Sequence, residues 1–184
     1  MENFTVPTRE EVSENNQAIF DKLKGMIGFV PNLYAYYAKN ETALADYLAL
    51  QNRKSSLRAK EREIINLVVS QVNECEYCQA AHSTFGKMQG FTAEEILEVR
   101  QAEISFDAKF DTLAKFVKET TIKRGKPSAE AIEKLFAAGY TEANLVDIVM
   151  VIGDKIISNY LHGITQIAID WEAAPKLEAS AVNV

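Results

Sequence analysis

The sequence predicts an all-α protein, and two observations support this prediction. Apolar residues recur along most of the chain at the three- and four-residue spacing of amphipathic helices. No stretch alternates apolar and polar residues between turns, as a half-buried strand would. The one short apolar run that would suit a strand, residues 148–152, lies inside a longer helical pattern. We therefore expect a multi-helix bundle.

Length, composition and charge narrow the class of protein. The 184 residues, of which 47% are hydrophobic and 25% charged, suffice for one domain or for two small halves that share a core. A net charge of −6 without a basic block argues against nucleic acid and anionic membranes as partners. The first residues lack the basic and apolar segments of a signal peptide, and no run approaches ~18 consecutive apolar residues. We expect a cytoplasmic protein with one domain over residues 1–184 and flexible ends at residues 1–8 and 173–184.

Turn and capping residues divide the first half of the chain into helices. Gly28 and Pro31 end a first helix, and Ser56 is the expected N-cap of a fourth. Asn73 suits a break, because its side chain competes for local backbone hydrogen bonds. The first half is expected to form helices over residues 10–26, 32–38, 42–51 and 58–72.

Similar signals divide the second half. Gly90 suits the left-handed conformation that ends a helix, and Thr92 with Glu95 forms a capping-box pattern for the next one. Ser128 and Thr141 are expected to begin two further helices. The helices predicted here cover residues 75–88, 92–99, 106–123, 128–138 and 141–169.

The most informative stretch is residues 73–90, which contains both cysteines of the chain and one of its two histidines. Cys75, Cys78 and His82 are spaced three and four residues apart, so a helix would present them on one face. In a reducing compartment, a Cys-x-x-Cys pair is more often catalytic or metal-binding than a structural disulfide. We expect a dithiol redox site with His82 one helical turn from Cys78.

The position of the cysteines at the start of a helix bears on their reactivity. In the first turn, unpaired N–H groups and the helix dipole favour the thiolate, which is the nucleophilic form. His82 can accept a proton from Cys78, or pair as an imidazolium with its thiolate. The acidic neighbours Glu74 and Glu76 oppose this effect.

A carboxylate that orients the histidine would come from Glu63. In one unbroken helix, Glu63 and Cys75 would lie roughly 18 Å apart at about 1.5 Å per residue. A fold-back near Asn73 places Glu63 alongside His82 instead, because the two residues lie at nearly equal distances before and after the turn. The competing interpretation, slightly favoured by spacing alone, is a solvated Glu63 beside Arg62.

Two other interpretations of the cysteines stay open at this point. Zinc would need four ligands, and Cys75, Cys78 and His82 leave only Glu63 or His162 for the fourth. Three ligands on one helical face give poor tetrahedral geometry. Alternatively, both thiols are buried and inert. His162 has no partner that the sequence identifies, and such a histidine more often packs or lies at the surface.

The chain also resembles a known family. Glu63, eleven further residues and the run Cys75-x-x-Cys78-x-x-x-His82 resemble the signature of the alkylhydroperoxidase D and carboxymuconolactone decarboxylase superfamily. Residues 73–82 are similar to its peroxidase-related branch in particular. The match is specific over residues 62–90, and the helical pattern elsewhere is compatible with the same branch.

The resemblance implies an all-helical thiol peroxidase that needs no cofactor. In such an enzyme Cys78 attacks a hydroperoxide and becomes a sulfenic acid, and Cys75 resolves it as an intramolecular disulfide. Glu63 and His82 relay protons. The resemblance further implies reduction by a dithiol partner, such as a lipoylated or thioredoxin-like protein, and a homo-oligomer of three or six subunits with the site near subunit contacts.

One residue departs from the family pattern. Tyr77 stands where characterised alkylhydroperoxidase D proteins carry an accessory histidine, which leaves the preferred substrate and reductant open. The decarboxylase branch lacks the cysteine pair, so its presence counts against lactone decarboxylation. The first hypothesis is an alkylhydroperoxidase-like antioxidant enzyme. The alternatives are a general thiol–disulfide oxidoreductase or redox sensor, and a non-catalytic helical assembly module.

Overall fold

The computed structural model describes residues 4–175 and 177, and within them the chain forms helices and no strand. This confirms the predicted all-α class, including a helix over residues 148–152. The chain divides into two compact units. One comprises the described residues up to Lys54 together with residues 160–170, and the other comprises residues 55–159 and the described residues from Trp171 onward. The expectation of a single domain over residues 1–184 stays a prediction.

The first unit is built from short helices. They are a 3-10 turn at Arg9–Glu11, α1 (Glu14–Ile27), α2 (Asn32–Tyr37), α3 (Ala43–Gln51) and the last residues of α9 (Glu142–Thr165). Helix α1 begins later than the predicted Glu10, because Ser13 is its N-cap and accepts a hydrogen bond from the Asn16 backbone N–H at 3.4 Å. The buried apolar side chains of this unit include Phe20, Leu23, Leu33, Leu44 and Tyr47.

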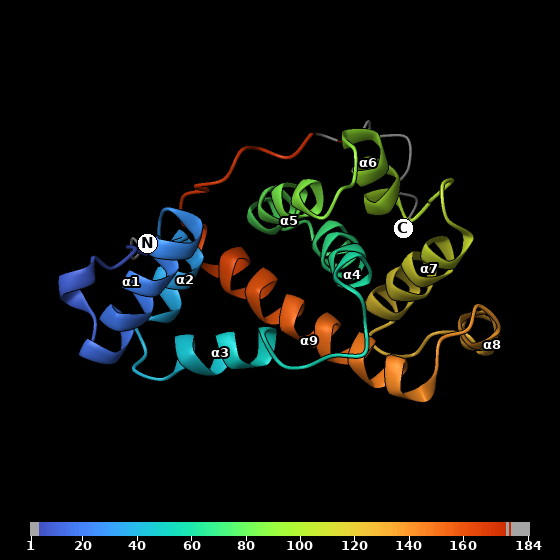
Figure 1. The fold of residues 1–184 in the computed structure, drawn as a ribbon, viewed down its shortest axis with the longest axis horizontal. Coiled ribbons are helices and arrows are strands. Elements are labelled where there is room, and N and C mark those ends of the chain that lie inside the picture. The colour runs from blue at the N-terminus through green and yellow to red at the C-terminus, as the bar shows by residue number, and fades with distance from the viewer. Residues whose placement is uncertain (1–3, 176, 178–184) are drawn as a thin grey trace. The chain divides into compact units, whose positions relative to one another are not determined.

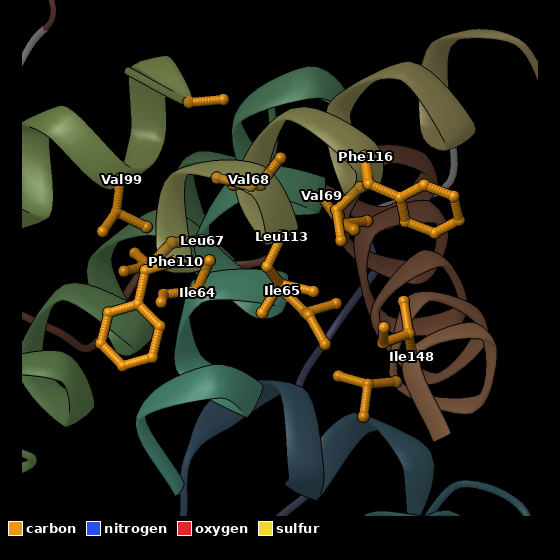
Figure 2. Close-up of a cluster of buried hydrophobic side chains, with 14 of the residues drawn as sticks. Ile64, Ile65, Leu67, Val68, Val69, Val99, Phe110, Leu113, Phe116 and Ile148 are labelled. Atoms are coloured by element: carbon orange, nitrogen blue, oxygen red, sulfur yellow. The ribbon is translucent and has the colours of Figure 1, made fainter. Parts of the chain in front are cut away.

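Helix α4 (Ala59–Val72) is the central helix of the second unit. It packs against α5 (Glu76–Met88), α6 (Ala93–Gln101) and α7 (Ala108–Ile122), and α8 (Ala129–Ala137) packs against α7 (Figure 1). Residues 64–69 of α4 are all buried, and the apolar ones join Leu113, Phe116 and Ile148 in the core shown in Figure 2. A helix segment that is apolar on most sides belongs inside a core. The polar residues Asn66 and Ser70, which lie within or next to this segment, are therefore carried into the interior.

Several predicted boundaries are confirmed. Gly28 and Gly90 follow their helices with φ of 92° and 84°, in the left-handed region that glycine tolerates. Thr92 and Glu95 form the predicted capping box, with the Thr92 N–H donating to the Glu95 carboxylate at 2.8 Å. Ser128 caps α8 by accepting from the Ala131 N–H at 3.2 Å.

Two further predicted helix starts are wrong. Ser56 is not the N-cap of α4; its hydroxyl donates to the Asp147 carboxylate at 2.7 Å, and Arg58 takes the N-cap position. Glu61 explains this shift, because its carboxylate accepts from the Arg58 N–H at 2.8 Å. Helix α7 begins after Asp107 rather than at residue 106, because the Asp107 side chain caps its first turn.

The predicted end of the last helix, at about residue 169, is also wrong. Helix α9 ends at Thr165, and the next residue, Gln166, has φ 48°. The Gln166 side-chain amide donates to the carbonyl of Gly163 at 2.9 Å, so it satisfies one of the acceptors left free at the helix end. Apolar periodicity continues past this point in the sequence, which is why the pattern alone overextends the helix.

Two other expectations concern the ends of the chain and membranes. Of the predicted flexible ends, residues 1–3, 176 and 178–184 lie outside the described residues, and the expectation stays a prediction for the remainder. Among the described helices, none alone combines the length and apolar composition needed to cross a membrane. Helices α8 and α9 meet that test only as a pair, bent by 118°.

Candidate active site

The candidate site is organised by the turn between α4 and α5. Asn73 ends α4, Glu74 adopts a left-handed conformation with φ 53°, and Cys75 becomes the N-cap of α5. The Cys75 N–H donates back to the Ser70 carbonyl at 3.0 Å, which closes the turn. The two helices therefore fold back on each other, as predicted, and one face of each contributes to the site.

The two thiols occupy different positions relative to α5. Cys78 lies within its first turn, whereas Cys75 precedes the helix, so the expectation that helical spacing sets both positions is wrong for Cys75. Cys75 is placed by capping, since its sulfur accepts a hydrogen bond from the Cys78 N–H at 3.4 Å. Both are free thiols, and both are buried, with Cys75 4% and Cys78 3% exposed.

Glu63 and His82 meet between α4 and α5. Glu63 Oε2 lies 2.8 Å from His82 Nδ1, and the Asn66 side-chain amide donates to Glu63 Oε1 at 3.2 Å. The Glu63 side chain is only 15% exposed, so the interpretation of a solvated carboxylate beside Arg62 is wrong. A carboxylate in this position fixes the orientation of the imidazole.

Opposing effects set the pKa of Glu63. Burial would raise it, but the charge of His82, the hydrogen bond with that ring, the charge of Lys155 and the Asn66 amide all lower it. The lowering effects prevail, and the pKa of Glu63 is held below its ordinary value. The carboxylate is therefore ionised at neutral pH.

The surroundings shift the pKa values of the two thiols in opposite directions. The hydrogen bond from Cys75 lowers the pKa of Cys78 most; burial opposes this, while the charges of Lys155 and His82 lower the pKa further. The pKa of the Cys75 thiol is raised, first by its hydrogen bond to Cys78, then by burial and by the Cys78 charge. The arrangement favours a Cys78 thiolate that accepts a hydrogen bond from a protonated Cys75.

Helix α9 supplies three polar residues that sequence reasoning did not assign to the site. Ser158 Oγ lies 3.8 Å from Cys78 Sγ, and Asn159 Oδ1 accepts from the Asn73 side-chain amide at 2.9 Å. The third is Lys155, one turn earlier on the same helix. The only sequence signal for this group is polar residues at three- and four-residue spacing within an otherwise apolar helix.

His162 and zinc belong to the alternatives that were left open. The His162 ring nitrogen Nε2 lies 3.1 Å from the Ile167 carbonyl, in the part of α9 that belongs to the first unit. In the described part of the chain, no group of three or more His, Cys, Asp or Glu side chains is arranged to hold a metal ion. Nothing in these residues supports the zinc alternative.

Comparison with known proteins agrees with this arrangement of helices. The model of the carboxymuconolactone decarboxylase family matches residues 37–119, which include the turn and all four candidate residues. A peroxidase-related protein of unknown function from Silicibacter sp. TM1040 has 24% sequence identity and a TM-score of 0.81, with 90% of each chain covered. An alkylhydroperoxidase AhpD core protein from Ralstonia eutropha JMP134, likewise peroxidase-related and uncharacterized, has 18% identity and a TM-score of 0.83, with 91% of this chain and 92% of that chain covered.

Residues 37–119 therefore match the carboxymuconolactone decarboxylase family, and the chain shares the fold of alkylhydroperoxidase D-like, peroxidase-related proteins. Another solved member of this fold is the debrominase Bmp8, in complex with 2,3,4-tribromopyrrole, at 14% identity and a TM-score of 0.76, with 92% of this chain and 93% of that chain covered. No curated protein matches the chain. These likenesses establish the fold, and they span proteins with different chemistry.

Tyr77, where the sequence departs from the alkylhydroperoxidase D pattern, is buried in the first turn of α5 directly before Cys78. An aromatic group lies next to His82. Trp171 packs edge-on against Phe85 at 5.2 Å between ring centroids, and Phe85 lies 5.8 Å from the His82 ring.

Two cavities of this unit lie away from the thiols. One of 310 Å³ lies between α7 and α8, and an apolar one of 470 Å³ lies between α7, α8 and α9. Because both cysteines are buried, a reaction at the thiols requires a small substrate or a movement of the side chains that cover them.

Proposed function

We propose that this protein is a dithiol peroxidase that reduces organic hydroperoxides with Cys78 as nucleophile and Cys75 as resolving thiol. The observation that carries the proposal is the pairing of the two sulfurs at the start of α5. The Cys75 sulfur already contacts the Cys78 backbone N–H at 3.4 Å, and the Cys78 pKa is lowered. A nucleophile and its resolving partner thus stand within one helical turn.

The first half of the reaction follows from the charges around Cys78. The thiolate attacks the terminal oxygen of the hydroperoxide, so an S–O bond forms and the O–O bond breaks. The alkoxide leaves and takes a proton from the His82 imidazolium, which Glu63 stabilises at 2.8 Å. The sulfur loses two electrons to the peroxide and becomes a sulfenic acid.

The second half uses Cys75. Its sulfur attacks the Cys78 sulfenic acid, an S–S bond forms, and the S–O bond breaks. The departing hydroxide takes up the Cys75 proton and leaves as water. In total, one hydroperoxide and two thiols give an alcohol, water and one disulfide. A dithiol reductant then restores both thiols.

Burial favours this function over the first alternative, a general thiol–disulfide oxidoreductase or redox sensor. Exchange with a folded protein requires that a sulfur be approached at the surface, whereas Cys75 and Cys78 are almost fully covered. A small hydroperoxide reaches a buried sulfur more readily than a folded protein does. For the same reason we infer that the reductant carries its dithiol on a slender group, such as a lipoyl arm, rather than on a globular surface.

Charge favours the function over the second alternative, a non-catalytic helical module. Inert thiols need no polar surroundings, and burying charged groups costs free energy unless they are paired. The structure nevertheless brings Glu63, His82 and Lys155 to the neighbourhood of Cys78. Such a cluster is typical of a reactive site.

The proposal includes a homo-oligomer. Helix α9 presents exposed apolar side chains at helical spacing, namely Val146, Val149, Met150 and Ile157. A contiguous exposed apolar stripe of this kind is typical of an interface. We propose that copies of the chain associate through this face, as a trimer or hexamer.

One experiment tests the proposed reaction. Purified wild-type protein, Cys78→Ser and Cys75→Ser are each given tert-butyl hydroperoxide with dihydrolipoamide, and peroxide loss is followed. We expect turnover to vanish in Cys78→Ser, while Cys75→Ser reacts once and holds a sulfenic acid on Cys78 that dimedone traps for mass spectrometry. Substituting the exposed Ser105 by Ala serves as a control for handling and should change nothing. Undiminished turnover by folded Cys78→Ser would exclude the function.

A further inference from the structure

A buried lysine lies on the face of α9 that is turned towards the thiols. Lys155 is only 2% exposed and is among the largest fully buried side chains of the protein. Ser158, three residues later, donates to the Lys155 carbonyl at 3.0 Å and lies 3.8 Å from Cys78 Sγ. Asn159, four residues later, bonds to the turn residue Asn73. Residues three and four apart share one helix face, so Lys155 faces the same site.

The burial of this ammonium group calls for a nearby anion. A charged amine removed from water is costly unless a negative group compensates it. Across the residues that the structure describes, Lys155 forms no ion pair with a carboxylate within 4.0 Å. Its charge acts on two anions of the site instead, the Glu63 carboxylate and the Cys78 thiolate.

Glu63 and Lys155 act on different members of the site. Glu63 Oε2 lies 2.8 Å from His82 Nδ1, so the carboxylate orients the imidazole ring. The Lys155 ammonium favours a negative charge on Cys78.

We propose that Lys155 is a positioning residue of the site, which holds Cys78 as a thiolate before the hydroperoxide arrives. The inference rests on the proposed peroxidase function and adds to it a cation outside the Glu63–His82 pair. Lys155 exchanges no proton with the substrate; it acts through Cys78. When the sulfur is oxidised to a neutral sulfenic acid, the compensation is lost, so the charge of Lys155 also favours return to the reduced thiolate.

The test removes the charge and keeps the length of the side chain. Lys155→Met is compared with Lys155→Arg, which keeps the charge, and with Lys134→Met, the same chemical change at an exposed lysine of α8. All three are made in a Cys75→Ser background, so that Cys78 is the single thiol. The rate of alkylation by iodoacetamide is measured from pH 4 to pH 10, and circular dichroism confirms that each variant is folded.

We expect the midpoint of the alkylation profile to rise by about one to two pH units in Lys155→Met, the effect of a unit charge at an effective dielectric constant of about 20. It should stay near that of the background protein in Lys155→Arg and Lys134→Met. Peroxide reduction by Lys155→Met in the Cys75-containing protein should fall about two- to tenfold at pH 6, because the thiolate fraction falls by that factor, and recover as the pH rises.

An unchanged midpoint in folded Lys155→Met would overturn the inference. If that variant does not fold, Lys155→Gln is judged by the same criterion. This failure is distinguishable from failure of the proposed function, because the function is judged by peroxide turnover in Cys78→Ser and the inference by the titration of Cys78. An equal rise of the midpoint in Lys155→Met and in the charge-keeping Lys155→Arg would point to packing alone and would likewise overturn it.

Discussion

Replacing Glu63 by Gln tests the proton relay while leaving its shape intact. The Gln side-chain carbonyl can still accept the hydrogen bond from His82 Nδ1–H, and the same chain length keeps Asn66 within reach. What is lost is the negative charge 2.8 Å from the imidazole. Two unit charges about 4 Å apart interact by about 4 kcal/mol at an effective dielectric constant of about 20. Hydrogen bonds to charged groups measured by mutation contribute about 1.5–3 kcal/mol.

We take about 2 kcal/mol as the stabilisation of the imidazolium that Glu63→Gln removes. At about 1.4 kcal/mol for each factor of ten, this corresponds to roughly a 30-fold fall in the rate of peroxide reduction at pH 7. Stopped-flow measurement of tert-butyl hydroperoxide consumption at saturating dihydrolipoamide gives this rate. Glu133→Gln, the same change at an exposed position of α8, should keep the wild-type rate. A folded Glu63→Gln protein with the wild-type rate would refute the reasoning.

Three further predictions concern the reactivity of the thiolate, its effect on stability, and the assembly. The hydrogen bond from Cys75 lowers the pKa of Cys78 most, burial opposes it, and the charges of Lys155 and His82 lower it further, to about 5. The alkylation rate of wild-type Cys78 should therefore stay level from pH 8 to about pH 6 and fall by half near pH 5. The folded-state pKa of Cys78 lies below its ordinary value of 9.0, so the thiolate stabilises the folded protein fully above about pH 9. This stabilisation is lost as the pH falls to about 5. The free energies of unfolding that urea gives for wild type and Cys78→Ser should therefore differ most at high pH; a difference that does not change with pH would contradict this. Ile157→Glu, on the exposed face of α9, should reduce the mass measured by light scattering to that of a monomer, and an unchanged oligomer would place the interface elsewhere.

The sequence offers the contact between Glu63 and His82 but does not decide it. The two residues are separated by one turn between adjacent helices, and their distances from Asn73 are nearly equal. Spacing alone slightly favours a solvated Glu63, because it does not show which face of each helix is buried; the family resemblance favours the contact. Local reasoning does place the caps at Thr92 and Ser128, where a short polar side chain and the following N–H groups decide the outcome.

Sequence reasoning fails where tertiary packing decides. Ser158 approaches Cys78 from 80 residues away along the chain, and nothing local in α9 indicates which of its faces meets α5. Lys155 looks like a surface lysine in the sequence, because lysines are seldom fully buried. The prediction that Cys75 lies within the helix fails for another reason. The Cys75 sulfur accepts the hydrogen bond that caps α5, so the helix begins one residue after the Cys-x-x-Cys motif begins.

The arrangement of α4 explains how the site can be buried without destabilising the core. Its apolar residues 64–69 hold the second unit together on most sides, while Glu63, Asn66, Ser70 and Asn73 recur at three- and four-residue spacing along one face. Each of these four side chains has a polar partner, which is His82 for Glu63, Glu63 for Asn66, and Asn159 for both Ser70 and Asn73. A polar stripe paired in this way costs less in the interior than unpaired groups would. The unbalanced element is Lys155, whose charge no carboxylate pairs within 4.0 Å in the described part of the chain, and a thiolate at Cys78 is the anion that the site can generate to balance it.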